Sequence, residues 1–244
     1  DFSNLDREPD RVMADQFDDE WTNIVFVGRV IANKKIEDLI RFFHAYHTTF
    51  NPRSRLLLVG SYGGYEKYLA SLNQLARTLG AGHVHFLGHV SDEELVAYYD
   101  IADLFLCASE HEGFCVPIVE AFYKQVPVLA YAATAVPDTM DGAGVLYDDK
   151  DPRSVAMLMD AIVSNVPLQD AIVREQLEAV GRLQDEDFAG TLLGYVDEVL
   201  AAPRAPRPRV AFDFWPQFDA AQELEELRLY RPAIYKALPE EPGN

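Results

Sequence analysis

Six short apolar runs, the first four of them closed by glycine or serine, most constrain what this chain can fold into. They occupy residues 24–28, 56–60, 84–88, 104–109, 126–131 and 144–147. Runs of this length match strands that are buried on both faces, as the strands of a parallel sheet are. Helical stripes separate the runs, for example Ile36, Leu39, Ile40, Phe43 and Phe50. This alternation predicts an α/β fold with a doubly wound, mostly parallel sheet of six strands and right-handed crossovers.

The chain length allows one large domain or one domain with an appendage, and local composition favours the second. Residues 1–22 are acidic and lack periodicity, which predicts a linker. Residues 23–202 hold the strand and helix pattern, and a proline-rich stretch then breaks regular structure. Residues 203–244 are predicted to be a tail, which packs either on its own domain or on a domain outside this chain. Its aromatic residues are Phe212, Phe214, Trp215, Phe218, Tyr230 and Tyr235.

The formal net charge of −19 limits the partners that this chain can have. Nucleic-acid binding requires clustered Lys and Arg, so we predict no nucleic-acid partner. A local cationic patch for a small anion is compatible with this charge, because physiological salt screens exposed charges beyond about 8 Å.

Two cysteines, Cys107 and Cys115, are too few for a disulfide framework, and their spacing matches no zinc motif. No carboxylate and histidine cluster has the spacing of metal ligands, so we predict that no metal and no other cofactor is required. The sequence shows no secretion signal and no apolar run of the roughly 20 residues that span a bilayer. We therefore expect a cytoplasmic protein, while peripheral membrane contact through segments outside this chain stays open.

Unusual residues gather where the predicted strands end, the edge of an open parallel sheet at which ligands bind. Gly28 and Arg29 follow the first strand, and Lys34 and Lys35 begin the next helix. A guanidinium, an ammonium and free backbone N–H groups in one loop suit a diphosphate. The alternative is that the cations only cap or solvate a helix end. Lys35 is the second choice for the role of Lys34.

The loop after the fourth predicted strand carries the most specific pattern. Gly113 lets the backbone pass close to a ligand, and Phe114 and Val116 are expected to anchor the loop. Pro117 starts a helix whose free N–H groups face the same crevice. Glu120, near the first turn of this helix, can accept hydrogen bonds from ribose hydroxyls or can interact only with the helix dipole.

These residues resemble the signatures of the family-four retaining glycosyltransferases. The segment EGFCVPIVE from Glu112 to Glu120 is similar to the E-x7-E motif, and Gly28-Arg29 with Lys34 is similar to the G-R-x4-K diphosphate loop. Also similar are Val59-Gly60, Phe86-Leu-Gly88, Ala102-Asp-Leu-Phe, Ser109, Glu120-Ala-Phe and Val126-Pro-Val. The resemblance runs from about residue 24 to residue 163. It implies that residues 23–202 are a nucleotide-sugar-binding, Rossmann-like half of a GT-B fold, and that residues 1–22 lead from an N-terminal acceptor domain outside this chain.

The resemblance also implies a role for each matching residue. The expected catalytic groups are Arg29 and Lys34, which bind the donor diphosphate, and Glu112, which contacts the transferred sugar. Glu120 is expected to bind the ribose, and the loop at His89 and Val90 is expected to take the base. The remaining donor-binding positions are Gly28, Gly113, Phe114, Cys115 and Val116.

Three departures from the family pattern lie in loops that would face the hexose. Cys115 stands where the family usually has glycine, and Asp138 stands where glutamate is common. Thr134-Ala135 stands where glycines are frequent. The sequence therefore does not identify the sugar.

The function predicted from these residues is transfer of a hexose from a UDP-sugar or GDP-sugar, with retention, to an unidentified acceptor. We expect the chain alone to transfer no sugar, because half of its crevice would be open to water. One alternative is a non-catalytic nucleotide-sugar-binding or assembly module. Another is a glycosidase with Glu112 and Glu120 as acid and nucleophile, although a glycosidase would have no use for the cationic loop. No G-x-G-x-x-G or G-x4-G-K-[ST] loop follows a strand, which disfavours a dehydrogenase or a kinase.

Overall fold

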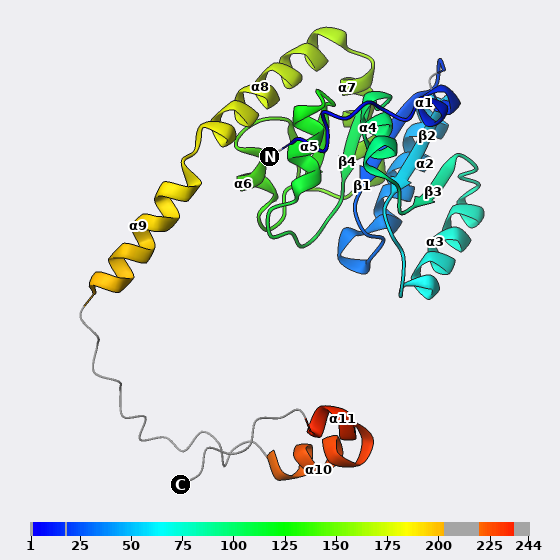
Figure 1. Ribbon diagram of the computed structural model, residues 1–244. Coiled ribbons are helices and arrows are strands. Elements are labelled where there is room, and N and C mark those ends of the chain that lie inside the picture. Colours follow the sequence, from blue (N-terminus) through cyan, green and yellow to red (C-terminus); the bar gives the residue numbers. More distant parts are fainter. Residues whose placement is uncertain (1, 18, 203–219, 237–244) are drawn as a thin grey trace. The chain divides into compact units, whose positions relative to one another are not determined.

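A computed structural model describes residues 2–17, 19–202 and 220–236 of the chain (Figure 1). The chain forms two compact units, Asp1–Glu186 and Asp187–Asn244. Most of the predicted aromatic tail, including Phe212 and Trp215, lies outside the described residues.

The first unit is built on a six-stranded parallel sheet with the order β3-β2-β1-β4-β5-β6. The strands are β1 (Thr22–Val27), β2 (Ser54–Val59), β3 (Val84–Gly88), β4 (Leu104–Cys107), β5 (Val128–Tyr131) and β6 (Val145–Tyr147). Each of them coincides with one predicted apolar run. In the centre of the sheet, Ile24 lies beside Leu56 on one side and Leu104 on the other. The predicted doubly wound α/β fold is confirmed, with every strand pair parallel.

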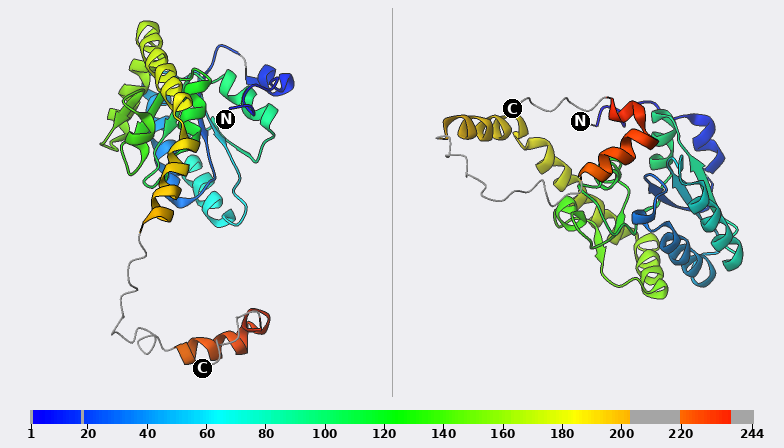
Figure 2. Two further views of the ribbon diagram at one scale, coloured as in Figure 1. Left: turned by 60° about the vertical axis from the view of Figure 1, so that its left-hand side comes forward. Right: turned by 90° about the horizontal axis from the view of Figure 1, so that it is seen from below.

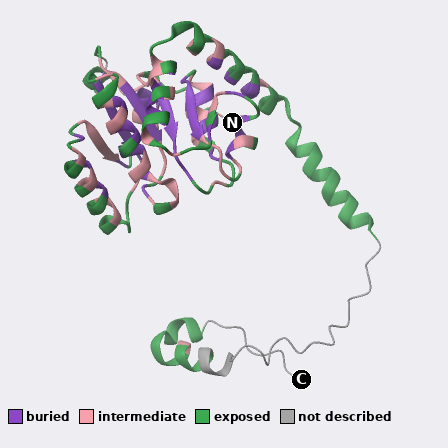
Figure 3. Cartoon of the chain, turned by 180° about the vertical axis from the view of Figure 1, so that it is seen from behind, coloured by how far each residue is buried: buried purple, intermediate pink, exposed green. Residues whose placement is uncertain are grey.

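Helices cover both faces of this sheet (Figures 1 and 2). One face packs against α2 (Ile36–Thr49), α3 (Glu66–Leu79) and α7 (Pro152–Val163), and the other packs against α4 (Asp92–Asp100), α5 (Val116–Tyr123) and α8 (Val166–Asp185). Neighbouring residues of a strand point to opposite faces, so Ile24 joins the first core and Val25 joins the second. The four inner strands β2, β1, β4 and β5 are therefore buried along most of their length, whereas the edge strands β3 and β6 are partly exposed (Figure 3). Phe50, expected on the buried stripe, follows the end of α2 and is exposed.

The segment before β1 packs on the sheet domain. Helix α1 (Arg11–Phe17) contacts α4, and the side chains of Leu5 and Phe17 are buried. Arg7 pairs with Asp92 and Glu93 at the start of α4, at 3.0 and 2.8 Å. This compact unit includes the predicted linker and ends at Glu186, so it differs from the predicted boundaries after residues 22 and 202.

A buried amide fastens α8 to the sheet. Gln176 is fully buried, its Oε1 accepts a hydrogen bond from the backbone of Val128, and its Nε2 donates to the carbonyl of Val126, both at 2.9 Å. The short helix α6 (Val136–Met140) completes this side of the unit.

The second unit contains the helices α9 (Phe188–Ala201), α10 (Ala220–Tyr230) and α11 (Pro232–Tyr235) among its described residues. Asp187 caps α9 by accepting a hydrogen bond from the backbone of Gly190 at 2.9 Å. Across the described part of the chain, no single helix is both long and apolar enough to cross a membrane. The pair α7 and α8, bent by 91°, reaches that length and hydropathy only when taken together.

Candidate functional site

After the neighbouring strands β1 and β4, the chain continues in opposite directions along the sheet. After β1 the chain continues to β2 and β3, and after β4 it continues to β5 and β6. The loops that follow β1 and β4 therefore diverge, and this switch point is where open α/β sheets bind ligands. The predicted residues from Gly28 to Lys35 and from Glu110 to Cys115 lie on these two loops.

Two glycines bring the loops after β1 and β2 into backbone contact. Gly28 donates its N–H to the carbonyl of Val59 at 2.9 Å, and Val30 donates to the carbonyl of Ser61 at 3.0 Å. Gly60 has a φ of +143°, and a Cβ at this position would lie 2.0 Å from the carbonyl oxygen of Gly28. The close approach that fixes the cationic loop therefore requires glycine at position 60.

An ion pair joins the two loops of the switch point. Lys34, at the end of a short 3-10 helix (Ala32–Lys34), places its Nζ 2.5 Å from Oε1 of Glu112. The side chains of Lys34 and Glu112 are 17% and 8% exposed, so the pair is largely shielded from water. The structure thus brings together two of the predicted catalytic residues, although they are 78 positions apart in the sequence.

The other two cations of the first loop differ in their surroundings. Arg29 is exposed, and its guanidinium lies 5.8 Å from the centre of the Tyr65 ring, so its donors stay accessible. Lys35 contacts Glu110 at 3.1 Å, and this hydrogen bond raises the pKa of Lys35. Lys34 and Lys35 are thus each paired with a glutamate, whereas among the described residues Arg29 has no acidic partner.

Short polar side chains fasten the loop after β4 on both of its sides. Asn33 donates from Nδ2 to the carbonyl of His111 at 3.0 Å. The hydroxyl of Thr134, in the loop after β5, accepts from the backbone N–H of Glu112 at 2.9 Å. Thr139 of α6 donates to the carbonyl of Phe114. No sequence pattern indicates these bridging roles, because each depends on residues far apart in the chain.

Lys150 is a further residue at the site whose role the sequence patterns do not reveal. Its Nζ donates to the carbonyl of Ala108 and contacts Asp38, both at 3.1 Å, and it reaches Glu110 at 3.3 Å. It also lies 4.3 Å from the centre of the Tyr131 ring. Lys150 therefore supports the end of β4, from which the loop that carries Glu112 departs.

Phe114 and Val116 do not anchor the loop with their side chains, so that expectation is wrong. They are 45% and 53% exposed, and a Cβ at Gly113 would meet nothing within 4 Å. The loop is held instead through its backbone and through Glu112. An open loop of this kind leaves backbone groups accessible to a ligand.

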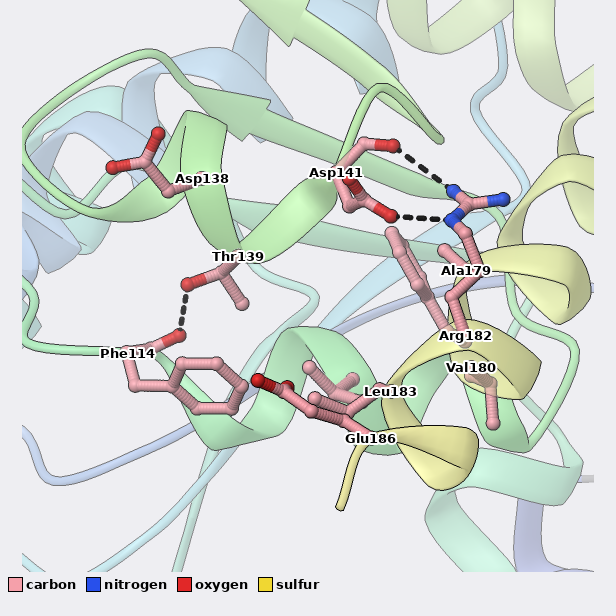
Figure 4. A pocket seen from close by; sticks show the side chains of 11 residues that line it. Phe114, Asp138, Thr139, Asp141, Ala179, Val180, Arg182, Leu183 and Glu186 are labelled. Atoms are coloured by element: carbon pink, nitrogen blue, oxygen red, sulfur yellow. Dashed lines mark hydrogen bonds and ion pairs between the residues drawn. The ribbon is translucent and has the colours of Figure 1, made fainter. Parts of the chain in front are cut away.

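A pocket of about 300 Å³ lies beside Phe114, between α5, α6 and the end of α8 (Figure 4). Asp141 and Arg182 form an ion pair at its rim, at 2.6 Å, and Thr139 lines it from α6. This pocket is next to the loop after β4 but does not lie between the loops of β1 and β4.

Glu120 lies in α5, which begins immediately after Cys115 in the left-handed conformation. Oε2 of Glu120 accepts a hydrogen bond from the hydroxyl of the buried Tyr99 at 3.0 Å. Burial raises the pKa of Glu120, although the bond from Tyr99 acts in the opposite direction. The side chain of Asn4 also donates a hydrogen bond to this carboxylate, and the proposed ribose contact remains a prediction.

The substitution Glu120→Gln distinguishes the effect of the buried charge on stability from the proposed contact with the ribose. Glutamine retains an acceptor for Tyr99 and removes the charge that burial disfavours, so the free energy of unfolding at pH 7 is expected to be no lower than in the wild type. Because the pKa of Glu120 is raised in the folded state, wild-type stability should fall as the pH rises from about 4.5 through the folded pKa. The variant should lack this portion of the pH dependence.

We expect nucleotide affinity to fall about tenfold in Glu120→Gln, since one charge-assisted bond to the ribose is lost. Urea unfolding from pH 4 to 8 and calorimetric titration with nucleoside diphosphates measure the two quantities. A variant with wild-type affinity would contradict the ribose contact.

The fold also joins the two cysteines that the sequence pattern left unconnected. The ligand atoms of Cys107, Glu112 and Cys115 all lie within 4.8 Å of one another. A hydrogen bond from Cys115 lowers the pKa of Cys107 to about 7, while the same contact and burial raise the pKa of Cys115. The spacing of the cysteines in the sequence matches no zinc motif, and the fold nevertheless brings both thiols close to the carboxylate of Glu112.

The residues predicted to take the base lie farther along the same edge of the sheet. His89 is exposed and Val90 is half-buried, and both follow β3, three positions from β4 in the strand order. Gly60 donates its N–H to the carbonyl of Gly88 at 2.8 Å, which connects this loop to the loops after β2 and β1. Their role in base binding remains a prediction.

The sheet order, the layering and the position of the polar loops define a class of protein. They are those of a Rossmann-like domain, as found in each half of a GT-B fold. Within that class, residues 12–178 match the family model described as glycosyl transferases group 1. The chain belongs to this family.

Curated relatives agree with that assignment. The chain is 30% identical over 167 residues to O-antigen chain mannosyltransferase B of Escherichia coli, covering 68% of this chain and 42% of that protein. It is 31% identical over 148 residues to a D-inositol 3-phosphate glycosyltransferase of Corynebacterium diphtheriae, covering 59% and 35%. The chain therefore spans less than half the length of these curated relatives.

Among solved structures, the chain is similar to the C-terminal domain of a group 1 glycosyl transferase from Francisella tularensis. The TM-score is 0.59 at 23% identity, with 72% of this chain and 94% of that one covered. It is also similar to HepE of Anabaena in complex with UDP and glucose, with a TM-score of 0.63 at 21% identity and coverage of 81% and 52%. These likenesses establish the fold.

Proposed function

We propose that this chain forms the donor-binding half of a retaining glycosyltransferase, which transfers a hexose from a nucleoside-diphosphate sugar. The observation that carries the proposal is the Lys34–Glu112 ion pair at the switch point, with the exposed Arg29 in the same loop. The pair brings an ammonium and a carboxylate together, and these are the groups proposed to bind the diphosphate and the sugar. The relatives named as mannosyltransferases and the neighbour solved with UDP and glucose support a hexose donor.

In the proposed reaction, the bond between the anomeric carbon and the diphosphate breaks, and the acceptor attacks the same face of the sugar. Negative charge accumulates on the departing phosphate, so the groups that stabilise it lower the barrier. An ammonium carries three donors. Lys34 can therefore keep its bond to Glu112 and donate a hydrogen bond to a phosphate oxygen. The planar guanidinium of Arg29 can donate two parallel hydrogen bonds to the same diphosphate.

The acceptor is proposed to bind to a part of the protein outside this chain. The matched relatives are more than twice as long as the segment that they share with it. The loops after β1 and β4 are proposed to form one wall of the donor site, and a second wall would exclude water from the reacting sugar. The absence of turnover by the chain alone remains a prediction.

The family assignment favours transfer over the two alternatives weighed for this sequence. A glycosidase would have no use for the cations of the loop after β1, and the family model that matches this chain describes transferases. Among the described residues, no specific contact favours a module that binds nucleotide without catalysis.

A panel of UDP, GDP and their glucose and mannose esters, titrated calorimetrically against the chain, tests the proposal. We expect one diphosphate to bind, and we expect Arg29→Ala to weaken that binding about 10–100-fold, because a charge-assisted hydrogen bond is worth about 1.5–3 kcal/mol. Stability should change by less than about 0.5 kcal/mol, since Arg29 is exposed. Arg77→Ala, which removes a charge from α3 away from this edge, is the control.

If none of the nucleotides binds to the chain, the proposal fails at its first step. If Arg29→Ala and Arg77→Ala bind the nucleotide equally well, the diphosphate does not occupy the loop after β1.

A further inference from the structure

The two ends of the loop after β4 meet at a cluster of soft and hard ligand atoms. Cys107 is the last residue of β4, and Cys115 is the residue immediately before α5. Both are buried, and the carboxylate of Glu112 lies between them in sequence with its side chain 8% exposed. Their three ligand atoms lie within 4.8 Å of one another. We propose that Cys107, Glu112 and Cys115 form a binding site for a thiophilic divalent cation of the zinc class.

The ligand types and their spacing fit such a cation. Zinc binds thiolates at about 2.3 Å and carboxylate oxygens at about 2.0–2.2 Å in tetrahedral geometry, which separates ligand atoms by roughly 3.3–3.8 Å. To bind zinc, the three ligand atoms therefore need to move closer to one another by about 1.5 Å at most. Rotation about the side-chain torsions can provide this movement. Three protein ligands leave the fourth position to water, as in zinc sites that are not purely structural.

The backbone at Cys115 gives an independent observation. Its φ and ψ of 56° and 62° place it in the left-handed region, which costs a residue with a side chain about 1–2 kcal/mol and glycine almost nothing. Strained residues of this kind cluster at binding sites. Here the strain keeps a thiol against Cys107, an arrangement that glycine would abolish.

The charges of the cluster balance when a cation is bound. Two thiolates and the carboxylate carry three negative charges, and a divalent cation reduces the total to one. Lys34, which is 2.5 Å from Glu112, neutralises the remainder. A buried cation is tolerated only where charge and coordination are both satisfied, and this cluster provides both.

Occupancy of the site should oppose donor binding, and this consequence rests on the proposed function. A cation would share Glu112 with Lys34 and fix Cys115, and both Glu112 and the residues at the start of α5 are proposed to contact the donor. The cation and the donor would therefore bind in competition.

Metal binding to the full chain, in a non-chelating reductant, tests the site directly. With Co²⁺ as the probe we expect a thiolate charge-transfer band, and with Zn²⁺ in equilibrium dialysis we expect one ion per chain. Cys115→Gly should lower the affinity at least about 100-fold, more than the 10–100-fold typical of losing an outer-shell partner, and it suits the left-handed backbone. Glu112→Gln should weaken binding about tenfold. His111→Gln and Glu110→Gln, in the same loop, are matched controls and should bind like the wild type.

The proposal is overturned if the band is missing in the wild type, if Cys115→Gly retains the ion, or if His111→Gln loses it. Cys107→Ala provides a second ligand variant, and its fold is checked by circular dichroism. Nucleotide titration with and without Zn²⁺ forms a separate arm, in which Zn²⁺ should weaken binding about tenfold in the wild type and leave Cys115→Gly unaffected. An unchanged wild-type affinity overturns the competition, whereas failure to bind nucleotide without Zn²⁺ counts against the proposed function and leaves the cation site standing.

Discussion

Lys34→Met is expected to lower the free energy of unfolding by about 2–3 kcal/mol and to weaken nucleotide binding about 10–100-fold. Removing one partner of a buried ion pair costs about 3–5 kcal/mol, because the other charge stays buried without compensation. The Lys34–Glu112 pair is slightly exposed, so a smaller figure applies. Binding suffers separately, since a phosphate loses a charge-assisted donor.

The double variant Lys34→Met with Glu112→Gln distinguishes the two effects. Stability should return to within about 1 kcal/mol of the wild type, since neither charge remains, and nucleotide affinity should stay low. Lys35→Met is the matched control, because Lys35 contacts the half-exposed Glu110 and its loss should change both quantities little. Urea unfolding and calorimetric titration measure them. An equal loss of affinity in Lys35→Met would show that Lys34 is not the phosphate-binding cation.

Gly60→Ala is expected to lower the free energy of unfolding by at least about 3 kcal/mol. Its Cβ would lie 2.0 Å from the carbonyl oxygen of Gly28, and relief requires the backbone of β1 or β2 to move. The same movement would displace Arg29, which follows Gly28 directly, so the variant that still folds should also bind nucleotide poorly.

Gly63→Ala, in the same loop, is the control for this prediction. A Cβ at Gly63 would meet only the hydroxyl of Ser61, at 3.5 Å, so its stability should match the wild type within about 0.5 kcal/mol. Denaturant unfolding of both variants provides the comparison. If Gly60→Ala were as stable as Gly63→Ala, the backbone contact between the two loops would not be essential.

The sheet could be predicted because its strands are continuous apolar runs. The ends of the strands are harder to predict from the sequence, and β2 shows why. It begins at Ser54 and Arg55, which are polar but buried, and the guanidinium of Arg55 lies 5.2 and 5.3 Å from the ring centres of Phe17 and Trp21. Such stacking depends on a segment that precedes β1, so no local pattern indicates it.

The packing of the N-terminal segment on the sheet domain was not predicted, for a related reason. Leu5 and Phe17 are single apolar residues among charged ones, with no period that would predict burial, yet both pack against the second face of the sheet domain. Contacts of this kind are set by tertiary structure and not by the pattern of the segment itself.

At the site, the sequence indicated residues that are recognisable by their charged side chains, such as Arg29, Lys34 and Glu112. It did not identify Asn33 or Thr134, whose roles come from the loops opposite them, or the meeting of the two cysteines. The roles assigned in donor binding, and the cytoplasmic location, stay predictions.

Asn33 and Thr134 together have a further consequence. They hold the loop after β4 between its neighbours, so the loss of backbone freedom, about 1–2 kcal/mol per residue, occurs during folding and not when a ligand binds. Affinity for even a small, highly charged molecule can then come from few contacts. Changes that loosen either bridge should appear first as faster dissociation, with the contacting groups themselves intact.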